Sequence, residues 1–134
     1  MDSKKRTSVS SGTKWEAMAG YTRAVRVGDV IHVSGTTATD ENGNLVGGND
    51  AAAQARYAIQ KIERAMVALG GTLRDVVRTR VFVSDIKNWE SVARVHGEFF
   101  HDIRPVNTLV EAKLVGAEYL VEIEAEAIVE SVEG

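Results

Sequence analysis

The glutamates near the end of the chain are the residues best suited to acid–base chemistry. In the run from Leu120 to Val129, Glu122, Glu124 and Glu126 alternate with apolar residues. Because successive side chains of a strand point to opposite faces, this pattern predicts a strand with one apolar and one carboxylate face. Three carboxylates on one face need water or cations opposite them. Glu122, early in the strand, is a candidate for holding or activating a water molecule.

Two further places have chemistry that suits an anion. Arg104 precedes Pro105, which pushes it out of the helical region, and an arginine in such a loop can hold a carboxylate bidentately. A solvated arginine is the alternative. Ser34 and Gly35 end a β-branched run and lead into a loop rich in Gly, Thr and Asn. Backbone N–H groups and hydroxyls at such a strand end can cradle an anion, although a plain turn explains the same residues.

We expect no metal or cofactor. The three histidines are His32, His96 and His101, and the last two are five residues apart, which does not place them on one helical face. No cysteine is available as a thiolate ligand. The chain has no glycine-rich phosphate or dinucleotide motif, no zinc-protease motif and no nucleophile elbow. We interpret His32 as structural and His96 as a satisfied core histidine.

The elements that position these residues follow from hydrophobic periodicity. A hairpin is predicted over 23–27 and 30–34, with a turn at Gly28 and Asp29, and the segment 15–21 is expected to be a loop. A helix capped by Asn49 or Asp50 should run to Leu69 and end at Gly70 and Gly71. The remaining predicted elements are a strand over 75–84, a helix over 89–101 capped by Asn88, and a closing hairpin of 108–114 with 120–129. This order, ββαβαββ, predicts an α+β subunit with a mixed sheet and two helices on one face.

The sheet face away from the helices should be highly charged. We expect it to carry Arg78, Arg80, Glu111, Lys113, Glu122, Glu124 and Glu126, together with the apolar Phe82, Leu109 and Leu120. A solvated face is one interpretation, since antiparallel sheets often have one wet side. Closure of this face against other subunits is the other. Large apolar groups among paired charges favour the subunit interface.

Composition restricts the class of protein. We expect 134 residues to form one domain over 15–134, preceded by a flexible arm over 1–14. A net charge of −3 argues against nucleic acid as the main partner. No apolar run is long enough for a membrane span, and the N-terminus lacks the apolar region of a secretory signal, so we expect no membrane association and a cytoplasmic location.

The chain resembles the YjgF/Rid family of reactive intermediate deaminases, also known as the L-PSP endoribonuclease family. The matching pieces are Gly20 and Tyr21, VGDVIHVSGTTATDENG at 27–43, AAAQARYAIQKIERAMVALGGTLRDVVRTRVFVSDI at 51–86, EFF at 98–100 and VEIEAEA at 121–127. The resemblance implies a chorismate-mutase-like subunit in a homotrimeric barrel, with ligand clefts between subunits. It also implies cofactor-free hydrolysis of enamines and imines to 2-oxo acids and ammonia.

The family's cleft residues carry over unevenly. Tyr21, Ser34 and Glu122 stand where the family has a tyrosine, a strand-end serine and a water-holding glutamate. Deaminating members have an arginine before the fourth strand and a small residue two positions later. Val106 and Thr108 occupy those positions here, and Arg104 lies two residues upstream of the arginine position. The family's second-helix asparagine corresponds to Ala93.

Three functional hypotheses follow from these residues. The first is an imine or enamine hydrolase, with Arg104 holding the substrate anion, Glu122 positioning water, and Tyr21, Ser34, Gly35, Val106 and Thr108 shaping the cleft. The second is a non-catalytic trimer that binds a small metabolite in the same clefts, which Val106 and Ala93 favour. The third, RNA cleavage, is disfavoured because Arg78 and Arg80 are expected opposite carboxylates inside the assembly, leaving no basic face.

Overall fold

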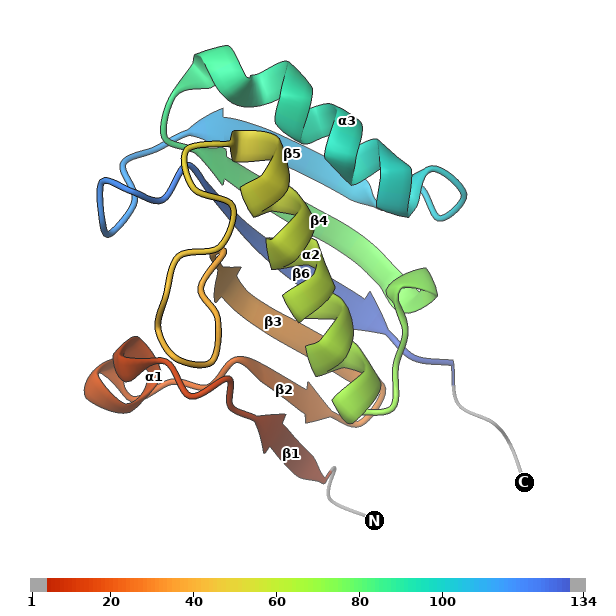
Figure 1. The fold of residues 1–134 in the computed structure, drawn as a ribbon. Coiled ribbons are helices and arrows are strands. Elements are labelled where there is room, and N and C mark those ends of the chain that lie inside the picture. The colour runs from red at the N-terminus through yellow and green to blue at the C-terminus, as the bar shows by residue number, and fades with distance from the viewer. Residues whose placement is uncertain (1–4, 131–134) are drawn as a thin grey trace.

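The computed structural model describes residues 5–130 and shows a twisted six-stranded mixed sheet with two helices on one face (Figure 1). The sheet order is β1-β2-β3-β6-β4-β5, with β4 and β5 parallel and every other pair antiparallel. The predicted α+β class is confirmed. The strands are β1 Arg6–Val9, β2 Ala24–Val27, β3 Val30–Thr36, β4 Val76–Val83, β5 Val106–Glu111 and β6 Val121–Ile128. The α-helices are α1 Lys14–Ala19, α2 Ala51–Ala68 and α3 Trp89–Phe100, with short 3-10 turns at Leu73–Asp75 and Ile86–Asn88.

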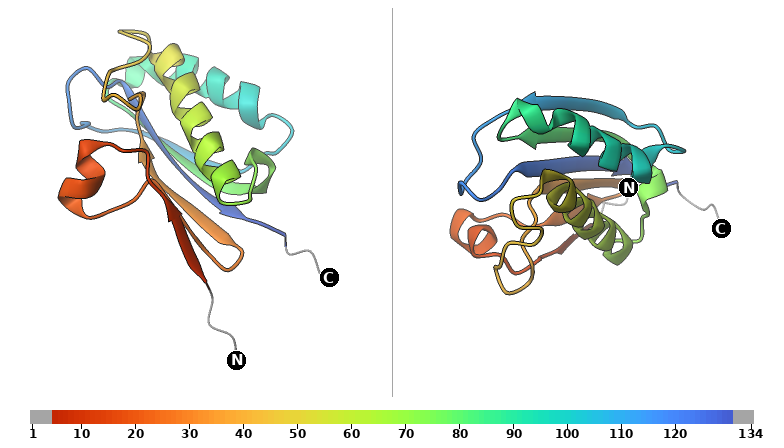
Figure 2. Two further views of the ribbon diagram at one scale, coloured as in Figure 1. Left: turned by 60° about the horizontal axis from the view of Figure 1, so that its bottom comes forward. Right: turned by 45° about the horizontal axis from the view of Figure 1, so that its top comes forward.

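The first hairpin and the long helix form as the sequence predicts. Gly28, at φ 61°, supplies the left-handed backbone that joins β2 to β3, and Val27 pairs with Val30. Helix α2 starts at the predicted Asp50, whose side chain accepts a hydrogen bond from the Ala53 amide at 3.2 Å. The apolar stripe of α2 packs with that of α3 on the inward side chains of β3, β6 and β4, and this layer is the core of the domain (Figure 2).

The predicted closing hairpin is wrong. Strand β5 pairs with β4, and β6 lies between β3 and β4. Helix α3 returns the chain to the end of the sheet where β4 began, so β5 runs parallel to β4 as in other β-helix-β crossovers. The inward residues of β6 are fully buried, whereas β5 is mostly exposed. Alternation revealed the two faces of each strand, but it carries no information about which strands are neighbours.

Pairing with β4 also changes which side chains of β5 reach the open face. The open face is the sheet face away from α2 and α3. Val106 lies opposite Arg78 and Thr108 opposite Arg80, so these residues and Val110 lie on the open face. Leu109 packs against the core, and Glu111 accepts a hydrogen bond from the Ile86 amide. The prediction that Leu109, Glu111 and Leu120 lie on the open face is therefore wrong, since Leu120 also packs against the core.

Two irregularities interrupt the strand alternation. A shift between Val76 and Arg78 buries Val76 and exposes Val77, so strict alternation does not extend to the start of β4. A second shift, between Val33 and Thr36, gives β3 one more residue than β6 across the same span. Ser34 and Gly35 lie in this bulge. Bulges are frequent beside functional sites because they redirect the side chains around them.

The N-terminal segment is more ordered than the sequence predicts. Residues 6–9 form β1 on the edge of the sheet, so the expected flexible arm does not hold for residues 6–13, and the predicted loop over 15–21 contains α1. Thr13 and Glu16 form a capping box at the start of α1, and Gly20, at φ 76°, ends it. A six-residue helix is too short to show a hydrophobic period, which explains why it was missed. Residues 1–4 of the predicted arm lie outside the described residues.

Within residues 5–130, no helix combines the length and the apolar character that crossing a bilayer requires. The cytoplasmic location and the domain limits of 15–134 stay predictions.

Candidate functional site

A cavity of about 270 Å³ opens at the end of the sheet where β3 finishes and β6 begins. Helix α1 forms one wall, Lys61 of α2 reaches it from the helix side, and Glu122 of β6 enters beside the β3 bulge. We call this space the Glu122 cavity. Its lining residues are Thr13, Trp15, Met18, Ala19, Tyr21, Arg23, Gly35, Thr37, Lys61, Val115 and Glu122.

Gly35 makes room for the Glu122 carboxylate. A Cβ atom built at position 35 would collide with Oε2 of Glu122, while the backbone of Gly35 lies outside the left-handed region. The glycine is therefore required for space and not for its φ angle. The carboxylate lies directly over the bulge, held against the end of β3.

The environment of Glu122 favours its protonated form more than that of an exposed glutamate does. Burial raises its pKa, while the positive charge of Arg23 opposes this rise and the negative charge of Glu124 adds to it. The net effect is a pKa above the ordinary glutamate value. A carboxylate of this kind can take a proton from water and return it to a leaving group.

A buried ion pair supports the cavity from below. Arg23 is 4 % exposed, and its Nη2 lies 3.3 Å from Oε2 of Glu16 in α1. Its Nη1 donates to the carbonyl of Gly35 and to Oγ1 of Thr36, which ties the bulge to α1. Sequence reasoning missed Arg23 and Glu16, because a charged residue in a short alternating strand or loop reads as a surface residue.

Hydrogen bonds keep Glu16 ionised. Burial alone would raise its pKa, but hydrogen bonds from Ser11, Ser10 and Thr13 outweigh this effect and lower the pKa to about 2. Ser10 donates to Oε1 at 2.8 Å and Thr13 to Oε2 at 2.9 Å. The segment before α1 therefore forms part of the support of the cavity.

Lys61 is a second buried cation, which sequence reasoning also missed. It is 7 % exposed, and its Nζ donates to the carbonyl of Thr37 at 3.2 Å. Burial and the nearby Arg23 lower its pKa to about 8. The one available signal was its place between Ile59 and Ile62, which puts it next to the buried face of the helix.

The structure brings three of the predicted site residues together. Tyr21, Gly35 and Glu122 line the same cavity. Ser34 is adjacent, but its hydroxyl donates to the carbonyl of Thr22 at 2.7 Å. Ser34 and Tyr21 also line a hollow of about 440 Å³ on the open face, where Arg80 pairs with both Glu124 and Glu126 at 3.0 Å. The predicted arrangement of Arg80 opposite carboxylates is confirmed.

Arg104, Val106 and Thr108 are not brought to this cavity within one subunit. Glu122 lies opposite Phe82, which is paired with Val110, so Val106 is four residues, or about 13 Å, further along β5. Arg104 comes before the start of β5, is exposed, and donates from Nε to the carbonyl of His101 at 2.8 Å. Arg104 and Val106 lie toward the opposite end of the sheet, whereas Thr108, opposite Arg80, lies midway along β5.

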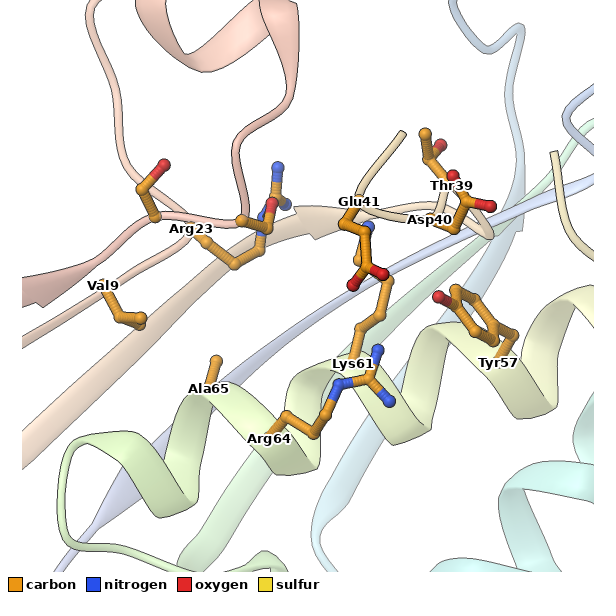
Figure 3. A pocket seen from close by; sticks show the side chains of 11 residues that line it. Val9, Arg23, Thr39, Asp40, Glu41, Tyr57, Lys61, Arg64 and Ala65 are labelled. Atoms are coloured by element: carbon orange, nitrogen blue, oxygen red, sulfur yellow. The ribbon is translucent and has the colours of Figure 1, made fainter. Parts of the chain in front are cut away.

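A second cavity, of about 320 Å³, lies on the helix side between α2, the loop after β3 and the end of β1. Figure 3 shows Arg64 and Tyr57 of α2 pointing into it from below and Glu41 from the opposite loop. We call it the helix-side cavity. Arg23 and Lys61 line both cavities and separate them.

Comparison with known proteins places this geometry in context. The family model described as Endoribonuclease L-PSP matches residues 12–129. The 3-aminoacrylate deaminase RutC of Acinetobacter baylyi is 33% identical over 106 residues, which is 79% of this chain and 84% of that protein. The uncharacterized protein SCO2049 of Streptomyces coelicolor is 36% identical over 120 residues, or 89% of each chain.

A solved structure of the same family also matches the fold of this chain. The crystal structure of Rv2704 from Mycobacterium tuberculosis, a member of the YjgF/YER057c/UK114 family, superposes with a TM-score of 0.85 and 48% sequence identity. The match covers 93% of this chain and all of that chain.

Proposed function

The chain belongs to the Endoribonuclease L-PSP family, which includes the YjgF proteins, and on that premise we propose that it hydrolyses small enamine or imine metabolites to 2-oxo acids and ammonia. Glu122 carries the proposal. It is a partly buried carboxylate with a raised pKa, held in a cavity of suitable size by a glycine that has no other evident role. The likeness to a 3-aminoacrylate deaminase supports deamination as the reaction class.

Glu122 supplies acid–base catalysis in this proposal. Its carboxylate accepts a proton from water while the water oxygen bonds to the imine carbon, and it returns that proton to the nitrogen, giving a neutral carbinolamine. The carboxylate then takes the hydroxyl proton as the carbonyl forms and passes it to the nitrogen as the C–N bond breaks, so that ammonia leaves. The sum is one imine and one water giving one 2-oxo acid and one ammonia. Tyr21, and the backbone beside Ser34 and Gly35, position the substrate.

We propose a homotrimer in which a neighbouring copy completes the cleft. Val106 is 59 % exposed and Val110 is 42 % exposed on the open face, and apolar side chains of this kind suit burial against another subunit. Val106 and Thr108, predicted to shape the cleft, would reach it from the neighbour, because their own subunit holds them away from Glu122. The anion-holding role of Arg104 would require the same neighbour.

A non-catalytic role as a metabolite-binding trimer is the second candidate. Val106 favours it, since an apolar side chain at that position cannot hold a substrate carboxylate. RNA cleavage is not proposed, because Arg80 is already paired with two carboxylates on the open face.

A coupled assay tests the proposal. A dehydratase generates an imine from serine or threonine, and release of 2-oxo acid is followed with and without this protein. We expect acceleration that is lost in Glu122→Gln and retained in Glu63→Gln, a matched change at an exposed position of α2. Arg104→Ala in the same series shows whether the predicted clamp contributes. Release at the spontaneous rate would reject hydrolysis and leave the binding role.

A further inference from the structure

Lys61 is a buried cation with unused hydrogen-bonding capacity. Its ammonium makes one hydrogen bond within residues 5–130, to the carbonyl of Thr37, so two of its three N–H donors remain for water or a ligand. Figure 3 shows the side chain rising from α2 toward the sheet, and Lys61 is in the lining of both cavities.

The buried residues near Lys61 carry more positive than negative charge. Three charged side chains are buried in the described residues, namely Arg23, Lys61 and Glu16. Glu16 is the ion-pair partner of Arg23 and also accepts hydrogen bonds from the serines before α1. No carboxylate of residues 5–130 lies within ion-pair distance of Lys61. Buried charges in proteins are normally paired, so a cation in this position favours an anionic ligand.

The other charged groups near Lys61 do not supply that partner. Asp40 uses Oδ1 to accept hydrogen bonds from the amides of Asn42 and Asn44. Glu41 and Arg64 are exposed at the mouth of the helix-side cavity, and Arg64 lies over the ring of Tyr57. Glu122 lines the Glu122 cavity with Lys61, but it does not lie within ion-pair distance of Lys61 in the described residues, and burial raises its pKa.

We propose that Lys61 binds the anionic end of the ligand, a carboxylate of a small organic acid, inside the Glu122 cavity. The proposal rests on the proposed function for the identity of the site. Trp15, Met18 and Val115 give this cavity an apolar wall for the remainder of the ligand. The helix-side cavity adds Arg64 to the two shared cations, but it carries two carboxylates, Asp40 and Glu41, against one in the Glu122 cavity. Lys61 thus supplies, from its own subunit, the charge that Val106 lacks.

A lysine at this position gives ligand binding a distinctive pH dependence. Burial and Arg23 lower the pKa of Lys61 to about 8, so the ammonium form that attracts an anion predominates below that pH. As the pH rises above 8 the charge is lost and affinity should fall, by at most about tenfold for each pH unit. An arginine clamp would not titrate in this range.

The experiment is a titration with 2-oxobutanoate as the probe, followed by NMR of the protein from about pH 6.5 to about pH 9.5. Native protein, Lys61→Met, Lys61→Arg and the exposed control Lys87→Met are compared. We expect the affinity of the native protein to fall about tenfold or more between neutral pH and the highest pH. At neutral pH, Lys61→Met should bind at least about tenfold more weakly, and Lys87→Met should match the native protein. Lys61→Arg should retain binding with a flat pH profile.

Several results would overturn the proposal. These are native-like binding by Lys61→Met, no saturable binding by the native protein, a flat native pH profile, or probe-induced shifts confined to Tyr57 and Arg64. If Lys61→Met does not fold, the pH profiles of the native protein and of Lys61→Arg decide the question.

Failure of this inference is separable from failure of the proposed function. Glu122→Gln should bind the probe at least as tightly as the native protein while losing imine hydrolysis. Lysine-dependent binding without hydrolysis by the native protein would reject catalysis and keep Lys61 as the anion receptor. Hydrolysis with native-like probe binding in Lys61→Met would keep catalysis and reject the receptor.

Discussion

At the scale of single residues, the site depends on the close approach of the Glu122 side chain to the backbone of Gly35. Glu122 occupies the volume that any side chain at position 35 would need, and it does so beside a strand bulge. The carboxylate can take this position because Gly35 has no side chain. The alternation of residues along β6 does not reveal this contact.

Substituting Gly35 tests this relation. Gly35→Ala should displace the Glu122 carboxylate and lower kcat for imine hydrolysis about a hundredfold, because a shift of about 1 Å at a reacting group has effects of that size. The midpoint of thermal unfolding should change little, since the flexible end of Glu122 can move. Gly97→Ala is the matched control. A Cβ at position 97 meets nothing within 4 Å, and alanine in helix α3 should stabilise the protein slightly without changing kcat.

The pH–rate profile provides a second test at this scale. Because burial raises the pKa of Glu122, the base form should be lost at a higher pH than for an ordinary glutamate as the solution is acidified. We therefore expect kcat to decrease on acidification with a midpoint above about pH 4.5. The substrate for this measurement should have a known ionisation of its own. An acid limb at or below the ordinary glutamate pKa would contradict this environment for Glu122.

At the scale of elements, a buried ion pair ties α1 to the sheet. Glu16 of α1 and Arg23 before β2 are both almost completely buried, and the guanidinium also binds the carbonyl of Gly35. Removing one partner of a buried pair leaves an uncompensated charge and is costly.

The Glu16→Gln variant should lower the free energy of unfolding by about 3 kcal/mol at neutral pH, measured with urea. The pKa of Glu16 is lowered to about 2, so its contribution is complete above the ordinary value of 4.5 and is lost as the pH falls from 4.5 toward 2. The difference between the native protein and the variant should shrink across that range. Glu98→Gln removes the exposed pair with Arg56 and should cost less than about 1 kcal/mol. Equal effects of the two variants would refute the role of Glu16.

The sequence predicts the elements that have a clear hydrophobic period. It does not predict the strand order, which depends on strand pairing, or the buried cations, which depend on tertiary packing. Helix α2, the β2–β3 hairpin and the two faces of β6 follow from spacing and turn residues, and all three form. The order of β5 and β6 does not follow, because a strand with a correct apolar face can pair with several neighbours. Arg23 and Lys61 were missed because residue type alone does not show whether a cation is buried or solvated. Only tertiary packing distinguishes the two cases.

At the scale of the whole molecule, the open face is the surface that suits assembly. It combines the ion pairs of Arg80 with exposed valines on β5, whereas the opposite sheet face is covered by α2 and α3 (Figure 2). This combination of apolar groups and paired charges is typical of subunit interfaces.

Light scattering tests the assembly. We expect a mass of three subunits for the native protein and a monomer for Val110→Glu, because the substitution places an unpaired charge in the proposed interface. Val67→Glu is the control, since Val67 is also exposed but belongs to α2 on the other side of the sheet. It should remain a trimer. A monomeric native protein would remove the neighbouring copy from the proposed cleft.

The hydrogen bonds of Glu16 have a practical consequence for handling the protein. Ser10, Ser11 and Thr13 hold Glu16, Glu16 pairs with Arg23, and Arg23 binds the strand segment that faces Glu122. An affinity tag or a truncation that disturbs residues 10–13 should therefore alter the Glu122 cavity through these contacts, although residues 10–13 are far from Glu122 in the sequence. The start of β1 and the end of β6 both lie at the opposite end of the sheet from Glu122, so a change confined to either place leaves these contacts intact.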